Sequence, residues 1–84
     1  MNHRHRKILE DIFAKPTKAD VSWPDIESLF LALGAEIEEG RGSRVRIAMG
    51  GVRSVFHRPH PKHIAGKAMV DSVRDFLVLA GVKP

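Results

Sequence analysis

Apolar residues recur at helical spacing in three segments of the chain. Apolar positions three or four residues apart are typical of helices that bury one face. The spacing predicts helices over residues 3–14, 22–33 and 67–80. Their apolar stripes are Ile8, Leu9, Ile12 and Phe13; Ile26, Leu29, Phe30 and Leu33; and Met69, Val73, Phe76, Leu77 and Ala80. Ser22 and Pro24 suit the start of the second helix, and Gly34 suits its end.

Between the second and third helices, apolar and polar residues alternate as they do in half-buried strands. The alternation predicts strands over residues 35–39, 43–49 and 52–57. Gly50 and Gly51 separate the last two strands. A two-residue hairpin turn requires positive φ at both positions, which glycine adopts without strain. These segments therefore predict an antiparallel sheet with a tight hairpin.

A two-residue turn fixes the register of this hairpin and so decides which residues share a face. One face carries the pairs Met49–Val52, Ile47–Ser54 and Val45–Phe56, and the other carries Ala48–Arg53, Arg46–Val55 and Arg44–His57. The first face is apolar except for the serine, so we expect the helices to bury its apolar residues. The second face is basic and bears a histidine, so we expect it to stay open.

The predicted order of elements, α-α-β-β-β-α, indicates an α+β fold in which helices cover one face of a three-stranded antiparallel sheet. A chain of 84 residues fits one domain, residues 1–84. Residues 15–21 and 58–66 contain prolines and are expected to be loops.

Composition narrows the class of protein. The chain has no cysteine, so neither disulfides nor thiolate metal sites can stabilise it, which fits the cytoplasm. No apolar run reaches the roughly 18 residues of a membrane span, so no membrane partner is expected. The basic start of the chain lacks the apolar run of a signal peptide. His3 and His5 lie there, near a terminus that is expected to fray.

The charge is distributed unevenly along the chain, whose net charge is +4. No carboxylate occurs between Gly40 and Val70. A block of one sign can be no more than a solvated face, but one this long more often marks an anion site, here RNA or DNA. The residues expected to bind RNA are Arg41, Ser43, Arg44, Arg46, Arg53, Arg58 and Lys62.

Three histidines follow one another closely after the third predicted strand: His57, His60 and His63. RNA cleavage needs a base for the 2′-hydroxyl, an acid for the leaving 5′-oxygen and cations for the phosphorane oxygens. Histidine suits both proton transfers near neutral pH. We therefore regard His57 and His60 as candidate catalytic residues. The alternative is a polar loop whose histidines only add positive charge.

No metal or other cofactor is expected. The three histidines lack a cysteine or carboxylate ligand nearby, and their surroundings are cationic, which disfavours a divalent ion. Trp23 could stack on a base, but in the first turn of an amphipathic helix a core position or a partner contact is the more common role.

The order of these motifs resembles the HicA toxins of bacterial HicBA toxin–antitoxin modules. The shared features are the Gly-Ser turn, the Arg/Val strand, the Gly-Gly turn, Phe-His-Arg-Pro-His-Pro and a closing helix with Phe-Leu-x-x-Ala-Gly-Val. The resemblance covers residues 25–84 and begins within the predicted helix 22–33. We therefore take residues 22–84 as the HicA-like core and residues 3–14 as a helical extension. It implies a fold similar to the double-stranded-RNA-binding domain, metal-independent endonucleolytic cleavage of mRNA, and neutralisation by a HicB-like antitoxin.

The sequence departs from the family pattern at one important point. Members usually carry a histidine one or two residues after the Gly-Ser turn, and that histidine is essential for cleavage. Arg44 and Val45 occupy these positions here. Because His57 faces Arg44 in the predicted hairpin, we expect it to supply the missing imidazole. One alternative is a non-catalytic module that binds only RNA or the antitoxin. The other, a DNA-binding domain, is disfavoured because no predicted helix is basic along one face.

Overall fold

The computed structural model describes residues 1–84 as three helices and two antiparallel sheets. The elements in chain order are α1 (His3–Phe13), β1 (Val21–Ser22), α2 (Trp23–Ala32), β2 (Glu36–Glu39), β3 (Arg44–Met49), β4 (Val52–His57), β5 (Ile64–Ala65) and α3 (Lys67–Leu79). None of the helices has the length and apolar character needed to cross a membrane.

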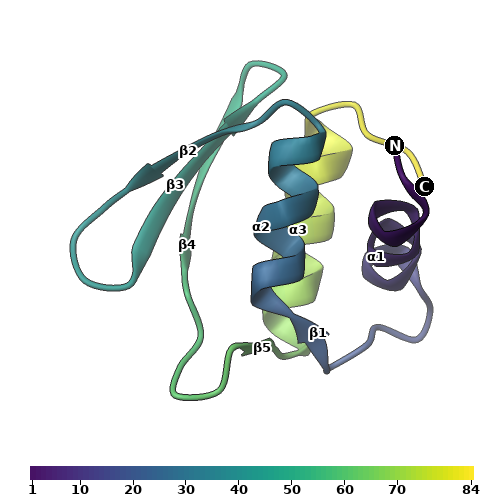
Figure 1. The fold of residues 1–84 in the computed structure, drawn as a ribbon, viewed down its shortest axis with the longest axis horizontal. Coiled ribbons are helices and arrows are strands. Elements are labelled where there is room, and N and C mark those ends of the chain that lie inside the picture. The colour runs from purple at the N-terminus through teal and green to yellow at the C-terminus, as the bar shows by residue number, and fades with distance from the viewer.

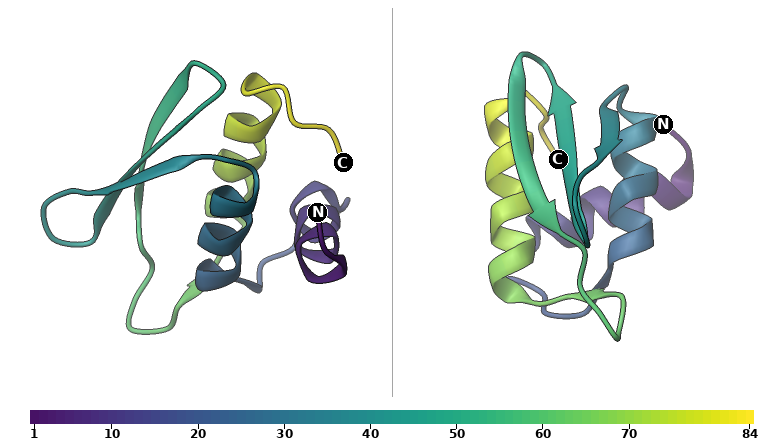
Figure 2. Two further views of the ribbon diagram at one scale, coloured as in Figure 1. Left: turned by 45° about the horizontal axis from the view of Figure 1, so that its top comes forward. Right: turned by 90° about the vertical axis from the view of Figure 1, so that its left-hand side faces the viewer.

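The main sheet and the helices form three layers (Figure 1). The three-stranded sheet, in the order β2-β3-β4, is one layer, and α2 and α3 lie side by side against one of its faces. Helix α1 packs on the far side of this helix pair, away from the sheet (Figures 1 and 2). The predicted α+β order and the one-sided covering of the sheet are confirmed.

The β3–β4 hairpin has the register that its sequence predicts, with all six expected pairs from Met49–Val52 to Arg44–His57. Val45, Ile47 and Phe56 are buried beneath the helices, as expected. Met49 and Val52 are only partly buried, although their pattern predicts full burial. They form the last pair before the turn, at the end of the sheet, where the helices cover them less completely.

The tip of the hairpin lies against the end of α3. Gly50 and Gly51 have φ of +58° and +78°, the positive values expected of a two-residue turn. A Cβ added to Gly50 would lie 2.8 Å from the carbonyl oxygen of Ala80, whereas one added to Gly51 would meet open space. Gly50 is therefore required both for its backbone conformation and for this close approach.

A second, two-stranded sheet was not predicted. β1 pairs with β5 through Val21–Ala65 and Ser22–Ile64. Val21 and β5 were expected to be loop, and Ser22 was expected to begin the second helix. Two-residue strands have no detectable alternation, so a sequence pattern cannot find them. At the start of α2 the N–H of Trp23 donates to the carbonyl of His63 at 2.9 Å, and Ser22 makes no side-chain cap. The small sheet therefore holds the loop after β4 against the start of α2.

Helix α1 is bound to the rest of the fold at both ends. Near its start, the His5 ring lies 2.8 Å from the Ser28 hydroxyl, and Asn2 accepts a 2.8 Å bond from the His5 N–H, so the expectation of a fraying terminus is wrong. Near its end, Arg74 of α3 donates to the Ile12 carbonyl at 2.9 Å. Between these contacts Ile8, Leu9 and Ile12 belong to the core.

The burial of α1 gives a prediction about stability. Leu9 is 5% exposed, so Leu9→Ala is expected to lower the free energy of unfolding by about 2–5 kcal/mol, the usual cost of a buried cavity. Leu31, which is 61% exposed on α2, is the matched control, and its alanine variant should change stability by about 0.5 kcal/mol or less. Urea denaturation measures both. Equal stability of the two variants would show that α1 contributes little to the core.

Candidate functional site

The strand ends of the β3–β4 hairpin bring Arg44 and His57 together. The two residues are direct partners in the register, and the N–H of Arg58 donates to the Ser43 carbonyl at 2.9 Å one step further along. In an antiparallel ladder, the pair next to such a hydrogen-bonded pair is a non-hydrogen-bonded one, whose side chains approach more closely. Arg44 and His57 therefore project side by side from the open face.

An open cleft of about 420 Å³ surrounds this pair, lined by Arg41, Gly42, Ser43, Arg44 and His57. The chain turns sharply here because Gly42 has φ of +60°. The cleft contains two guanidinium groups, one imidazole and a hydroxyl, and no carboxylate. The side chains of Arg41 and Arg44 have no ion-pair partner, so their charge is available to an anion.

His57 also borders a second cleft, of about 680 Å³, on the other side of β4. The start of α3 forms its opposite wall. Its lining residues are Ser54, Val55, Phe56, His57, Gly66, Lys67, Ala68, Met69 and Ser72. No sequence pattern predicts this cleft, because it forms where a helix that comes late in the chain approaches the edge strand β4.

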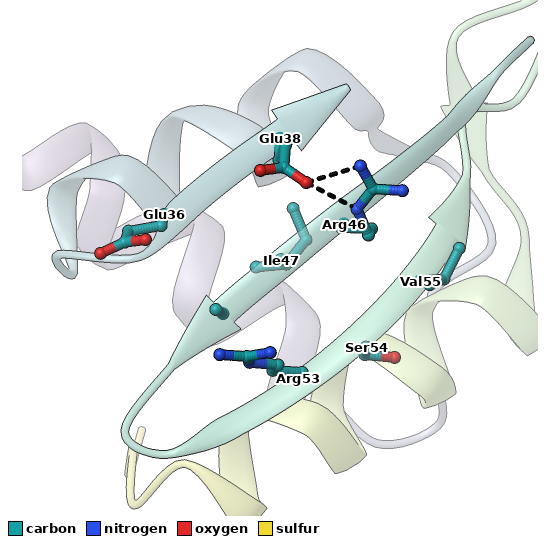
Figure 3. Close-up of a pocket in the computed structure, with 8 residues that line it drawn as sticks. Glu36, Glu38, Arg46, Ile47, Arg53, Ser54 and Val55 are labelled. Atoms are coloured by element: carbon teal, nitrogen blue, oxygen red, sulfur yellow. Dashed lines mark hydrogen bonds and ion pairs between the residues drawn. The ribbon is translucent and has the colours of Figure 1, made fainter. Parts of the chain in front are cut away.

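The rest of the open sheet face is less basic than its alternation implied (Figure 3). Glu36 and Glu38 of β2 share this face with the arginines of β3 and β4. Arg46 donates to one carboxylate oxygen of Glu38 from Nε at 2.8 Å and from Nη2 at 2.5 Å. Arg53 makes no ion pair. The positive charge of the face is thus partly neutralised on the side of β2.

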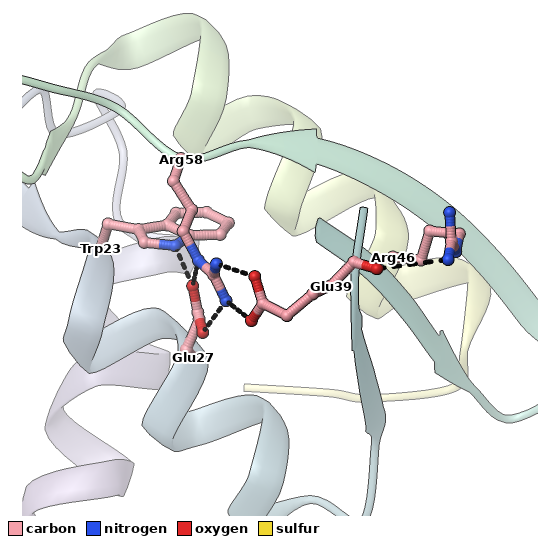
Figure 4. A network of polar contacts seen from close by, with 5 residues as sticks. All are labelled: Trp23, Glu27, Glu39, Arg46 and Arg58. Atoms are coloured by element: carbon pink, nitrogen blue, oxygen red, sulfur yellow. Dashed lines mark hydrogen bonds and ion pairs between the residues drawn. The ribbon is translucent and has the colours of Figure 1, made fainter. Parts of the chain in front are cut away.

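Arg58 lies on the opposite face of the sheet from Arg44 and His57. It pairs with Ser43, one step beyond them, so the pleat directs its side chain toward the helices. There its guanidinium binds Glu27 of α2 at 2.6 and 3.1 Å and Glu39 of β2 at 2.6 and 2.8 Å (Figure 4). Trp23 also donates to Glu27. Arg58 is therefore positioned for an internal network and is absent from the cleft.

The network shifts the pKa values of Glu39 and Arg58. Hydrogen bonds from Arg58 hold the pKa of the Glu39 carboxyl below its ordinary value. The bonds to Glu39 and Glu27 in turn raise the pKa of Arg58 above that of a free guanidinium. Glu39 and Arg58 are thus held in their charged forms, and the ion pairs of Arg58 with Glu27 and Glu39 join α2, β2 and the start of the loop after β4.

The loop after β4 carries the remaining predicted site residues. His60 and Lys62 are exposed, and their side chains make no hydrogen bond or ion pair. Neither lines the cleft that contains His57 and Arg44. The backbone of His63 is held by its bond to Trp23, although the sequence predicted only a loop there. No group of three or more His, Asp or Glu side chains is arranged to hold a metal ion.

Residues 23–82 match a protein family described as the HicA toxin of bacterial toxin–antitoxin systems. The chain belongs to the HicA toxin family. It is accordingly a toxin of a toxin–antitoxin module, as its resemblance to the family implied. Comparison with curated proteins and with solved structures found no match.

The family match separates two parts of this HicA toxin. It includes α2, the main sheet and α3, and with them Arg44 and His57. Helix α1 and strand β1 precede it.

Trp23, the first matched residue, is 2% exposed and packs on Phe56 with ring centroids 5.8 Å apart, so it belongs to the core. It is not free to stack on a base.

The Arg58 network gives a prediction about stability. Arg58→Ala should lower the free energy of unfolding by about 1–3 kcal/mol, because it leaves the partly buried Glu27 without a counter-charge. Arg53→Ala is the matched control, since Arg53 is exposed and unpaired, and it should cost about 0.5 kcal/mol or less. Urea denaturation at neutral pH measures both variants.

The pH dependence of this difference provides a further check. The lowered pKa of Glu39 contributes stability above the ordinary pKa of glutamate, and this contribution is lost as the pH falls through the folded-state pKa. The gap between the wild type and Arg58→Ala should therefore narrow in acid. A gap that is constant with pH would contradict the role of the Glu39 ion pair.

Proposed function

We propose that this HicA toxin is a metal-independent endoribonuclease that cleaves mRNA and is neutralised by a HicB-like antitoxin in the cytoplasm. The observation that carries the proposal is the pairing of His57 with Arg44 in a cleft without carboxylates. The arginine stands where the family pattern has its histidine, or directly before it. The imidazole thus comes from the neighbouring strand and reaches nearly the same space.

The cleft contains the base and the cations that RNA cleavage needs, and the loop after β4 offers an acid. His57 takes the proton of a 2′-hydroxyl, whose oxygen then attacks the adjacent phosphorus and displaces the 5′-oxygen of the next nucleotide. Arg41 and Arg44 stabilise the additional negative charge on the phosphorane oxygens, and Ser43 offers a hydroxyl to the phosphate. The departing 5′-oxygen takes up a proton, for which we propose His60 as the acid.

The remaining cations contact RNA on either side of the cleft. Arg53 and Lys62 are exposed and unpaired, so they bind phosphates without losing another partner. Arg46 and Arg58 first have to leave Glu38 and the Glu27–Glu39 pair, respectively, so their contribution to RNA affinity is smaller.

A second candidate function is a non-catalytic module that binds RNA or the antitoxin. The observation that favours it is the presence of Arg44 and Val45 in place of the family's histidine. A ribonuclease and a module that only binds RNA both use an anion site in the cleft, so RNA binding alone does not separate them. Cleavage by the wild type, and the loss of cleavage when the imidazole is removed, separate the two functions.

His57→Ala should abolish growth arrest and slow RNA cleavage by about 10²–10⁴-fold, the usual loss when a general base is removed. Its thermal midpoint should hardly change, because the side chain is exposed and makes no hydrogen bond. The assay combines induction in growing cells with cleavage of purified RNA in the presence of EDTA. His63→Ala, a histidine outside the cleft, is the control and should stay toxic. A toxic His57→Ala variant would refute the assignment of His57 as the base.

RNA affinity should fall steeply with salt. If four cations, Arg41, Arg44, Arg53 and Lys62, contact phosphates of a duplex, the slope of log affinity against log salt should be about −3 to −4. Arg44→Gln should reduce that slope by about 1. Arg6→Gln is the matched control, because Arg6 is exposed on α1, beyond the helix pair, and should leave the slope unchanged. A flat salt dependence would argue that the basic segment contacts protein instead.

A further inference from the structure

His57 stands between two clefts that differ in chemistry. The first contains Arg41 and Arg44 and has no apolar side chain. The second, between β4 and α3, has apolar walls formed by Val55, Phe56, Ala68 and Met69, with the hydroxyls of Ser54 and Ser72 among them. Only His57 lines both. A molecule that fills both clefts therefore passes beside His57.

The contents of the clefts correspond to the two parts of a nucleotide. A phosphate is held by guanidinium groups, which the first cleft supplies. A base has flat apolar faces and a polar edge, and it binds in sites with apolar walls and a few hydrogen-bonding groups, which the second cleft supplies. The second cleft also bears Lys67 and no carboxylate, so it does not repel the backbone of a polyanion.

A path across the open sheet face suits RNA less well. The hollow on that face, of about 450 Å³, is lined by Glu36 and Glu38 (Figure 3). Arg46, which also lines it, is already paired with Glu38. A phosphate on the β2 side of this hollow would meet two carboxylates, and only Arg53, on β4 at its other side, is unpaired. Neither cleft beside His57 contains a carboxylate.

We propose that the cleft between β4 and α3 is a base-binding subsite, and that the substrate of this toxin is therefore single-stranded RNA. In a duplex the base edges are paired and the faces are stacked, so a base can enter the cleft only when its nucleotide is unpaired. The base belongs to a nucleotide next to the phosphate held by Arg41 and Arg44. This inference rests on the proposed ribonuclease function and adds the substrate class to it.

Binding to RNA that cannot be cleaved tests the inference separately from catalysis. The probe is a fluorescein-labelled 2′-O-methyl RNA of about 12 nucleotides, long enough to cover the site, either single-stranded or annealed to its complement. Its blocked 2′-oxygen cannot attack the phosphorus. Fluorescence anisotropy with the wild-type toxin should show at least about tenfold tighter binding of the single strand, in line with the contribution of one unpaired base.

Two variants narrow the cleft without changing its charge. Ala68 and Ser72 are exposed and lie one turn apart on α3, so Ala68→Leu and Ser72→Leu leave the core intact. Each should weaken single-strand binding by about tenfold and leave duplex binding within about twofold. Ala32→Leu, at an exposed alanine of α2 outside the cleft, is the matched control and should bind as the wild type does.

The possible outcomes separate this inference from the ribonuclease function. Equal binding of duplex and single strand, or unchanged binding by both leucine variants, would overturn the base subsite while leaving cleavage untouched. Leucine variants that bind RNA normally but escape the antitoxin would assign the cleft to the antitoxin and overturn the subsite as well. Failure of the wild type to bind either RNA would overturn both proposals. A preference for the single strand that the leucine variants remove supports the subsite, even if no cleavage is found.

Discussion

The pleat of the β3–β4 hairpin is the constraint on which the rest of this structure depends. Successive side chains point to opposite faces, so one register places Val45 and Phe56 in the core and, at the neighbouring step, Arg44 and His57 on the open face. A slip of one residue would exchange the two sets. The positive φ of Gly50 and its close contact with the end of α3 hold the turn that sets this register.

The same alternation places Arg44 and Arg58 on opposite faces of the sheet, where they have different roles. Arg44 faces solvent beside His57, where its charge is unpaired. Arg58 faces the helices, where Glu27 and Glu39 neutralise it and where it fixes the first residue after β4. A cation contributes to anion binding only if it is not already paired, so charge counted along the chain overstates the charge offered to an anionic ligand. The basic site is accordingly smaller and more localised than the basic segment.

Strand β1 and helix α1, which precede the family match, help to hold the candidate site together with Trp23 and Arg58. β1 pairs with β5, and the N–H of Trp23 binds the carbonyl of His63, so the loop that carries His60 is held at its far end. Arg58 anchors the near end of that loop through its network. The loop therefore has two fixed ends and an exposed middle. Helix α1 supports this arrangement from behind, because it packs on both α2 and α3.

The sequence by itself determined the features that depend on local periodicity. Helical stripes, strand alternation and the Gly50-Gly51 turn predicted the order of the main elements and the pairing of Arg44 with His57, because each follows from a fixed repeat and a turn of known length. Only the tertiary structure decided where the loop after β4 is held, that Arg58 is paired and that a second cleft adjoins His57. These features bring together residues that are far apart in the chain: Arg58 binds Glu27, and Ser54 and Ser72 line one cleft. Such contacts depend on how the elements pack, which a local repeat in the sequence does not reveal.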